Sequence, residues 1–168
     1  MVDALKPAVE APKVVGDYEK LERRDGLWYF EGKAFTGIAG LKHENGQKKT
    51  ETTYKDGKEH GLYTEWRENG LKFKGSTYKD GKRHGLYTRW YGPGQKSAEG
   101  TYKDGKLDGL WTEWYSNGQK QWEFTFKEGK RAGLHTHWHK NGQKEEERTF
   151  KNGKKISEKH WDEDGTPW

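Results

Sequence analysis

The sequence predicts an all-β protein whose strands form an elongated, single-layer antiparallel meander sheet of tandem β-hairpins. Three observations predict this fold: a motif that recurs every 24 residues, two turn signals in each copy, and strand-favouring segments between the turns. Those segments are rich in Thr, Tyr, Trp and Phe, and no stretch shows a sustained helical period. We therefore expect the strands to follow one another along one sheet.

The recurring unit begins with YKDGK or a close variant. Its copies start at five positions, which are Tyr54, Tyr78, Tyr102, Phe126 and Phe150. The units are therefore expected near 30–53, 54–77, 78–101, 102–125 and 126–149, with a capping unit at 150–168. The whole array is expected to span 25–168. Residues 1–24 show no repeat and are predicted to form a flexible N-terminal tail or linker.

Each unit carries two turn signals, one of the Asp-Gly kind and one of the Asn-Gly kind. In one unit they are Asp56-Gly57 and Asn69-Gly70, and the two kinds alternate along the chain. Both dipeptides suit the positive φ angles of tight hairpin turns. The turns therefore set the order of the array as strand, turn, strand, turn.

Alternation of side chains along each strand assigns the residues to two faces of the sheet. One face is predicted to hold the structural core of the repeat, formed by columns of Leu and Trp: Leu62, Trp66, Leu86, Trp90, Leu110, Trp114, Leu134 and Trp138. The other face carries Tyr63, Tyr87 and Trp111, and is expected to have Tyr54, Tyr78 and Tyr102 as their neighbours. A bulge at either turn would reverse this second assignment.

The composition fits a one-layer sheet better than a conventional core. Leu, Ile, Val and Phe together number 22, whereas the chain has 9 Trp, 9 Tyr and 6 Phe. These few aliphatic side chains cannot fill the space between two packed layers. Cross-strand pairs of aromatic rings and of Thr are therefore expected to hold the sheet together. Long Lys stems are expected to cover the rings.

The sequence lacks several features that mark export or membrane anchoring. It has no Cys, which excludes disulfides, thiolate metal sites and a lipobox cysteine. No apolar run reaches the length of a transmembrane helix, and the N-terminus does not have the pattern of a secretory signal. These observations favour a cytoplasmic location as an expectation.

The consensus unit YKDGKxxGLxTxWyxNGQKxxEgT resembles the MORN repeat, and more closely its variant in bacterial YwqK-type proteins. The resemblance covers about Asp25 to Trp168. It implies slightly curved single-layer sheets of stacked hairpins and non-enzymatic roles in scaffolding, protein contact or phospholipid headgroup binding. Bacterial relatives of this variant are commonly named antitoxins or immunity proteins, so the resemblance also implies a toxin as one kind of partner.

One pattern in the chain could ligate a metal. It is the run of alternate histidines His135, His137 and His139, which a strand would place on one face. Such pairs of imidazoles bind zinc in proteins. The alternative interpretation is sequence drift in a surface column, because the aligned residues elsewhere are Tyr, Trp, Arg or Glu. We expect no metal and no cofactor, with the three histidines as the candidate ligands if one exists.

No catalytic residues are predicted. The acids alternate with Lys and Arg, no nucleophile elbow is present, and no glycine-rich loop precedes a helix. The net charge of +5 arises from 32 basic and 27 acidic residues that are interleaved, which is a weak footprint for nucleic acid. The sequence therefore predicts a protein that is not an enzyme and has no nucleic-acid partner.

The function expected is that of a non-enzymatic surface for protein–protein interaction, with neutralisation of a toxin as its specific form. The alternative left open is a peripheral module that binds membrane phospholipid or glycan. The candidate binding residues are Arg67, Tyr91, Tyr115, His139, Tyr63, Tyr87 and Trp111. The last strand, expected near 161–168, could also pair with a second copy and give an end-to-end homo-oligomer.

Overall fold

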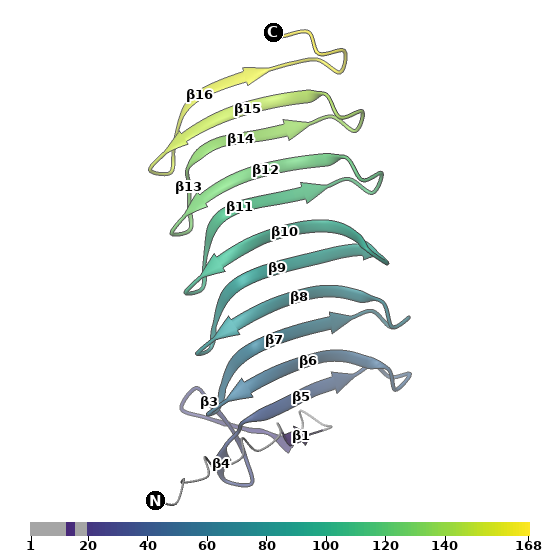
Figure 1. Ribbon diagram of the computed structural model, residues 1–168, viewed down its shortest axis with the longest axis vertical. Helices are drawn as coiled ribbons and strands as arrows, with labels where there is room; N and C mark the ends of the chain where they lie inside the picture. The colour runs from purple at the N-terminus through teal and green to yellow at the C-terminus, as the bar shows by residue number, and fades with distance from the viewer. Residues whose placement is uncertain (1–12, 16–19) are drawn as a thin grey trace, which may run out of the picture.

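The computed structural model describes residues 13–15 and 20–168, and most of these residues lie in strands. The strands form an open antiparallel meander, as the repeat predicts, and stack along one axis from the N-terminal to the C-terminal end (Figure 1). In the described part of the chain no helix is long and apolar enough to cross a membrane. The predicted fold class is confirmed.

Thirteen strands make up the long sheet. They are β1 (Lys13–Val15), β5 (Gly37–Lys42), β6 (Lys48–Lys55), β7 (Lys58–Trp66), β8 (Lys72–Lys79), β9 (Lys82–Gly92), β10 (Gln95–Lys103), β11 (Lys106–Trp114), β12 (Lys120–Lys127), β13 (Lys130–Arg131), β14 (Gly133–Trp138), β15 (Lys144–Lys151) and β16 (Lys154–His160). Every neighbouring pair is antiparallel except β1 and β5, which are parallel. Between β7 and β16 no other described element covers either face of the sheet (Figure 1).

A small second sheet lies at the N-terminal end. It consists of β2 (Glu22–Arg24), β3 (Leu27–Phe30) and β4 (Lys33–Ala34). Beside it lies the main cluster of buried apolar side chains, formed by Leu21, Phe35, Ala39 and Tyr54 with Trp28 and Phe30 packed against them. This cluster closes the N-terminal end of a sheet that has no second layer elsewhere.

The small sheet and the apolar cluster together form an N-terminal cap. This cap corrects the prediction that residues 1–24 are a tail. Residues 13–15 pair with β5, Leu21 belongs to the apolar cluster, and 22–24 form β2. Residues 1–12 and 16–19, the rest of the predicted tail, lie outside the described residues. The first edge of a long sheet has unpaired backbone groups, and β1 pairs with part of that edge here.

The opposite end of the sheet also differs from the prediction. The last strand is β16, which ends at His160, and the residues after it fold back along its end. The Trp168 N–H donates to the His160 carbonyl, and Trp161 forms an isolated bridge with Pro167. Exposed lysines such as Lys154, Lys155 and Lys159 lie on β16, where charge opposes pairing with another strand.

The two kinds of turn have different geometries. In the Asp-Gly kind both residues have positive φ, for example 50° at Asp104 and 86° at Gly105, which defines a type I′ turn. In the Asn-Gly kind only the glycine does, and the Asn carboxamide oxygen accepts a hydrogen bond from the backbone two residues on, 3.0 Å from Asn117 to Gln119. Positive φ is thus confirmed for both residues of the first kind and for the glycine of the second.

The Asp-Gly turns are bonded to the previous unit. The Gly105 N–H donates to the Arg83 carbonyl at 2.8 Å. The same bond recurs at the other turns of this row, from Gly57 to Phe35, Gly81 to Glu59, Gly129 to Leu107 and Gly153 to Arg131. Each hairpin is therefore tied to its predecessor outside the strand ladder.

The glycine that precedes each Leu lies in a bulge. Between β10 and β11 the register shifts after Gly100, and the Thr101 hydroxyl donates to the Asp108 carbonyl across the bulge. Gly109 has φ +104°, and a Cβ atom there would lie 2.6 Å from Thr101 Oγ1. Only glycine satisfies both constraints.

We expect Gly109→Ala to destabilise the protein by about 1–3 kcal/mol, because alanine adds backbone strain and a clash with the Thr101 hydroxyl. The measurement is the urea midpoint of unfolding. Gly92→Ala is the control, since a Cβ at Gly92 meets nothing within 4 Å, and it should change stability by less than about 0.5 kcal/mol. Equal effects of the two substitutions would contradict the bulge argument.

Candidate functional site

One face of the sheet, here called the leucine face, carries the columns of Leu, Thr and Trp. Its leucines are among the most exposed apolar residues described: Leu62 is 64% exposed, Leu86 50%, Leu110 52% and Leu134 50%. The prediction that these leucines are core residues is therefore wrong. Each leucine lies opposite a threonine in the neighbouring strand, as Leu110 does opposite Thr125.

The tryptophans of the same face are half-buried, because side chains of neighbouring units lie on them. The Lys48 ammonium lies 5.5 Å from the centre of the Trp66 ring and also pairs with Glu51 at 2.5 Å. Lys120 lies over Trp138 in the same way and pairs with Glu123. The expected cover of the rings by Lys is confirmed at these positions, and the Lys–Glu pairs leave this part of the face nearly neutral.

The other face, here called the tyrosine face, is held by contacts between rings. Tyr63 meets Tyr78 with ring centres 6.2 Å apart, and Tyr87 meets Tyr102 at 6.1 Å. Trp111 stacks on Tyr87 at 5.2 Å. The predicted neighbours therefore lie together, and the bulges do not reverse the assignment. These contacts show how the candidate binding residues Tyr63, Tyr87 and Trp111 contribute to packing of the sheet.

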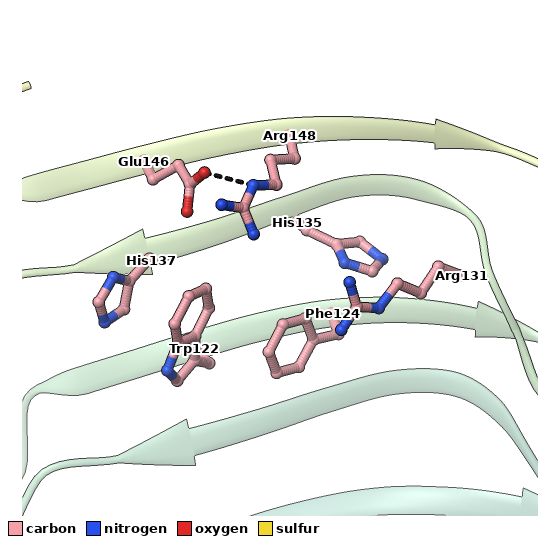
Figure 2. Close-up of a pocket in the computed structure, with 7 residues that line it drawn as sticks. All are labelled: Trp122, Phe124, Arg131, His135, His137, Glu146 and Arg148. Carbon is pink, nitrogen blue, oxygen red and sulfur yellow. Dashed lines mark ion pairs between the residues drawn. The ribbon is translucent and has the colours of Figure 1, made fainter. Parts of the chain in front are cut away.

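Ring packing on the tyrosine face changes where the fourth unit meets the fifth, and a pocket of about 130 Å³ opens there (Figure 2). Position 135 is a histidine in the column that holds Tyr63, Tyr87 and Trp111 in the preceding units. The pocket is lined by residues of β12, β13, β14 and β15: Trp122, Phe124, Arg131, His135, His137, Glu146 and Arg148. A smaller ring at a position of large rings accounts for the space.

The two arginines of the pocket differ in their partners. Arg148 Nε contacts the carboxylates of Glu146 and Glu158, the latter at 2.8 Å. The Arg131 guanidinium lies 5.4 Å from the Phe150 ring centre and 5.9 Å from that of Phe124, and makes no ion pair with a described residue. Arg148 is therefore held by two acids, whereas no described acid neutralises Arg131.

The acids near the pocket titrate differently. Burial raises the pKa of Glu146, and a hydrogen bond shared with Glu158 raises it further. Hydrogen bonds from Lys155 and Arg148 lower the pKa of Glu158 to about 2. Together with His160, these two glutamates are the one group of described residues whose ligand atoms lie close enough for a metal. Arg148 lies among the carboxylates and already supplies positive charge, so the group functions as a salt-bridge network.

The three candidate histidine ligands do not converge on one point. His135 is buried, with Nε2 3.1 Å from the Thr125 carbonyl oxygen. His137 and His139 both direct Nδ1 at Glu145, at 3.0 and 3.4 Å. Burial lowers the pKa of His135 and of His137.

The candidate binding residues Arg67, Tyr91, Tyr115 and His139 form one repeat column, and this column has a structural role that was not predicted from the sequence. The Tyr115 hydroxyl donates to the Trp138 carbonyl at 2.9 Å, 23 residues along the chain. The other members make the equivalent bond to the next unit's Trp: His43 to Trp66, Arg67 to Trp90, Tyr91 to Trp114 and His139 to Trp161. The signal in the sequence is that every residue of the column has a side chain able to donate to a carbonyl.

His60 and His84 also bind the next unit. Their Nδ1 atoms lie 3.2 and 3.3 Å from the carboxylates of Asp80 and Asp104 at the following turn. Asp108, which replaces them one unit later, accepts a hydrogen bond from the Glu128 N–H at 3.0 Å. All three residues therefore help to position the turn that follows.

The MORN repeat variant is the family whose model matches the chain, at residues 107–128 and 131–152. The two matches are adjacent repeats and contain β12, β14, β15, most of β11 and all seven residues that line the pocket. MORN repeats are a non-enzymatic type of repeat and generally mediate protein or membrane interactions. No curated protein matches the chain.

Tyr115→Phe should lower stability by about 1 kcal/mol, because it removes the hydroxyl that bonds the next unit and keeps the ring. The free energy of unfolding in urea measures this. Tyr29→Phe serves as control, since the Tyr29 hydroxyl makes no hydrogen bond with a described residue and its loss should cost less than about 0.5 kcal/mol. An unchanged stability of Tyr115→Phe would show that the column does not couple the units.

Stability should fall below about pH 6.5, partly because His135 resists protonation in the folded chain. As pH falls, the unfolded chain takes up the proton first, and stability is lost until the pH reaches the lowered pKa of the folded state. His135→Tyr removes this titration, so its melting temperature should fall less than that of the wild type between pH 8 and pH 5.5. Equal decreases in the melting temperatures of the two proteins would contradict the assignment of this pH dependence to His135.

Proposed function

We propose that the chain is a non-enzymatic repeat protein whose leucine face binds another protein. The observation that carries the proposal is the column of four exposed leucines, Leu62, Leu86, Leu110 and Leu134. One strand lies between the strands of successive leucines, so the leucines stand two strand spacings, roughly 9–10 Å, apart. Exposed apolar side chains that recur in one column mark an interaction surface more often than scattered single ones do.

The charges beside this row favour a protein as the partner. The lysines near the tryptophans pair with glutamates three residues on, as Lys48 does with Glu51 and Lys120 with Glu123. The leucine face is therefore apolar in the middle and of mixed charge at one side. Such a surface suits a protein interface with an apolar core and a polar rim, whereas anionic lipid attracts surfaces of one sign.

A membrane surface is the second candidate, and a separate observation favours it. Ten exposed lysines line the Asp-Gly edge of the sheet, in pairs that flank each turn: Lys55 and Lys58, Lys79 and Lys82, Lys103 and Lys106, Lys127 and Lys130, and Lys151 and Lys154. Clustered lysines are attracted to anionic headgroups. The acids at the same turns, such as Asp80 and Asp104, weaken this attraction.

Toxin neutralisation in the cytoplasm is the specific form of the proposal, and it rests on the resemblance to the bacterial repeat variant. It requires more than binding. The bound protein should be toxic when expressed alone and harmless when expressed with this chain. A partner that is harmless alone would remove this form of the proposal and leave the interaction surface intact.

The double substitution Leu86→Asp and Leu110→Asp should weaken binding of the partner by at least about 30-fold, if these leucines lie at the centre of the interface. The protein should remain folded, because both side chains are half exposed. Affinity capture from the source cells, followed by titration of the captured protein, gives the measurement. Ile156→Asp is the matched control, since Ile156 is 62% exposed and lies on the last strand outside the column.

Co-sedimentation with anionic vesicles at low and at physiological salt separates the two candidates. Binding that fades with salt, and that the leucine substitutions leave intact, would overturn the protein proposal in favour of the lysine edge. Partner binding that is equally strong in the double variant would place the interface away from the leucine face.

A further inference from the structure

The pocket on the tyrosine face has the size of a single side chain. Its volume of about 130 Å³ is well below the roughly 300–1,000 Å³ of sites for drug-sized ligands. One wall is aromatic: Trp122 and Phe124 stack with ring centres 5.2 Å apart, and His137 stacks on Trp122 at 3.7 Å. The occupant must therefore be small, with an apolar portion that lies against rings.

The charges around the pocket specify the rest of the occupant. Figure 2 shows the Arg131 guanidinium beside Phe124 and His135, and the terminal nitrogens of Arg148 directed toward the middle of the pocket. Glu146 is the one carboxylate of the lining, and its charge is engaged by Arg148 Nε. No acid among the described residues pairs with Arg131, so the pocket presents guanidinium donors without a matching anion.

The equivalent site two units earlier lacks this arrangement, which distinguishes the fifth unit. Arg83 occupies the same repeat position as Arg131. Its Nε donates to the Tyr78 hydroxyl at 3.3 Å, and the rings of Tyr87 and Tyr102 lie 5.7 and 5.4 Å from its guanidinium. A tyrosine hydroxyl and larger rings thus use the space and the donors that remain open at Arg131.

We propose that this pocket binds a carboxylate of side-chain size, held by Arg131 and the terminal nitrogens of Arg148, with its methylene groups against Trp122 and Phe124. Planar guanidinium groups bind carboxylates through paired hydrogen bonds, and an aromatic wall limits the access of water. The carboxylate belongs either to a free small acid or to a glutamate of a bound protein. The site lies on the face opposite the leucines, so it does not depend on the function proposed for the leucine face.

The test is an NMR titration of the full-length chain with three probes: propionate, a doubly blocked Ala-Glu-Ala peptide, and the matched Ala-Gln-Ala peptide. The signals of Arg131 Nε–H, the Trp122 indole and the ring of His135 report on the pocket. We expect propionate or the Glu peptide to shift them saturably and the Gln peptide not to do so. Saturation by propionate alone identifies a free acid, and tighter binding of the Glu peptide identifies a protein side chain.

Two variants and a control make the assignment specific. Arg131→Gln should weaken binding of the effective probe by about tenfold or more, because a charged paired hydrogen bond is lost. His135→Tyr should abolish binding by filling the space with the residue found at Tyr63 and Tyr87. Arg83→Gln makes the same charge change at the equivalent position and should alter binding by less than about twofold.

Three results would overturn the inference: no saturable shift with either carboxylate, equal shifts with the Gln peptide, or equal losses in Arg131→Gln and Arg83→Gln. Circular dichroism of each variant distinguishes lost binding from lost folding. Failure here would leave the leucine-face proposal standing, since that proposal is tested by Leu86→Asp and Leu110→Asp on the other face.

Discussion

Hydrogen bonds from each unit to main-chain groups of its neighbour are the interaction on which this sheet depends. At one edge the turn glycine donates back to the previous hairpin, as Gly105 does to Arg83. At the other edge a side chain reaches forward to the next tryptophan carbonyl, as Tyr115 does to Trp138. A sheet without a second layer has few buried apolar contacts, so bonds at both edges must supplement the strand ladder.

This arrangement leaves the two faces free to serve different purposes. The tyrosine face packs rings across strands and contributes to stability, while the leucine face exposes a row of apolar side chains that the sheet itself does not need. Where ring packing on the tyrosine face is interrupted, at His135, a pocket results in which Arg131 has no ion-pair partner among the described residues. Variation within a repeat column therefore creates a local site without disturbing the units on either side.

Much of the fold could be predicted from the sequence, because the turns and the alternation of side chains are local properties. The 24-residue step, the type I′ turns and the two faces all follow from them. The exposure of Leu110 could not be predicted, since alternation assigns a residue to a face but does not say whether anything covers that face. The N-terminal cap was missed because 21–24 lie outside the repeat and gain their partners only in three dimensions.

The site was less accessible to sequence reasoning. Variation among Arg67, Tyr91, Tyr115 and His139 suggested a binding column, yet their shared capacity to donate to a carbonyl is what the structure uses. The pocket depends on a difference in size, His135 in place of Trp111, combined with the position of Arg131. An alignment of the repeats shows that His135 and Arg131 differ from their counterparts in the preceding unit. Only the fold shows that they lie beside Trp122 and Arg148 (Figure 2).

Amide hydrogen exchange at the turn glycines tests the coupling between units most directly. The N–H groups of Gly81, Gly105 and Gly129 bond to the preceding unit, so they should exchange as slowly as the amides of the adjoining strands although they lie in exposed turns. Exchange at the rate of an unprotected loop, with the strands still protected, would contradict the claim that edge bonds hold the units together.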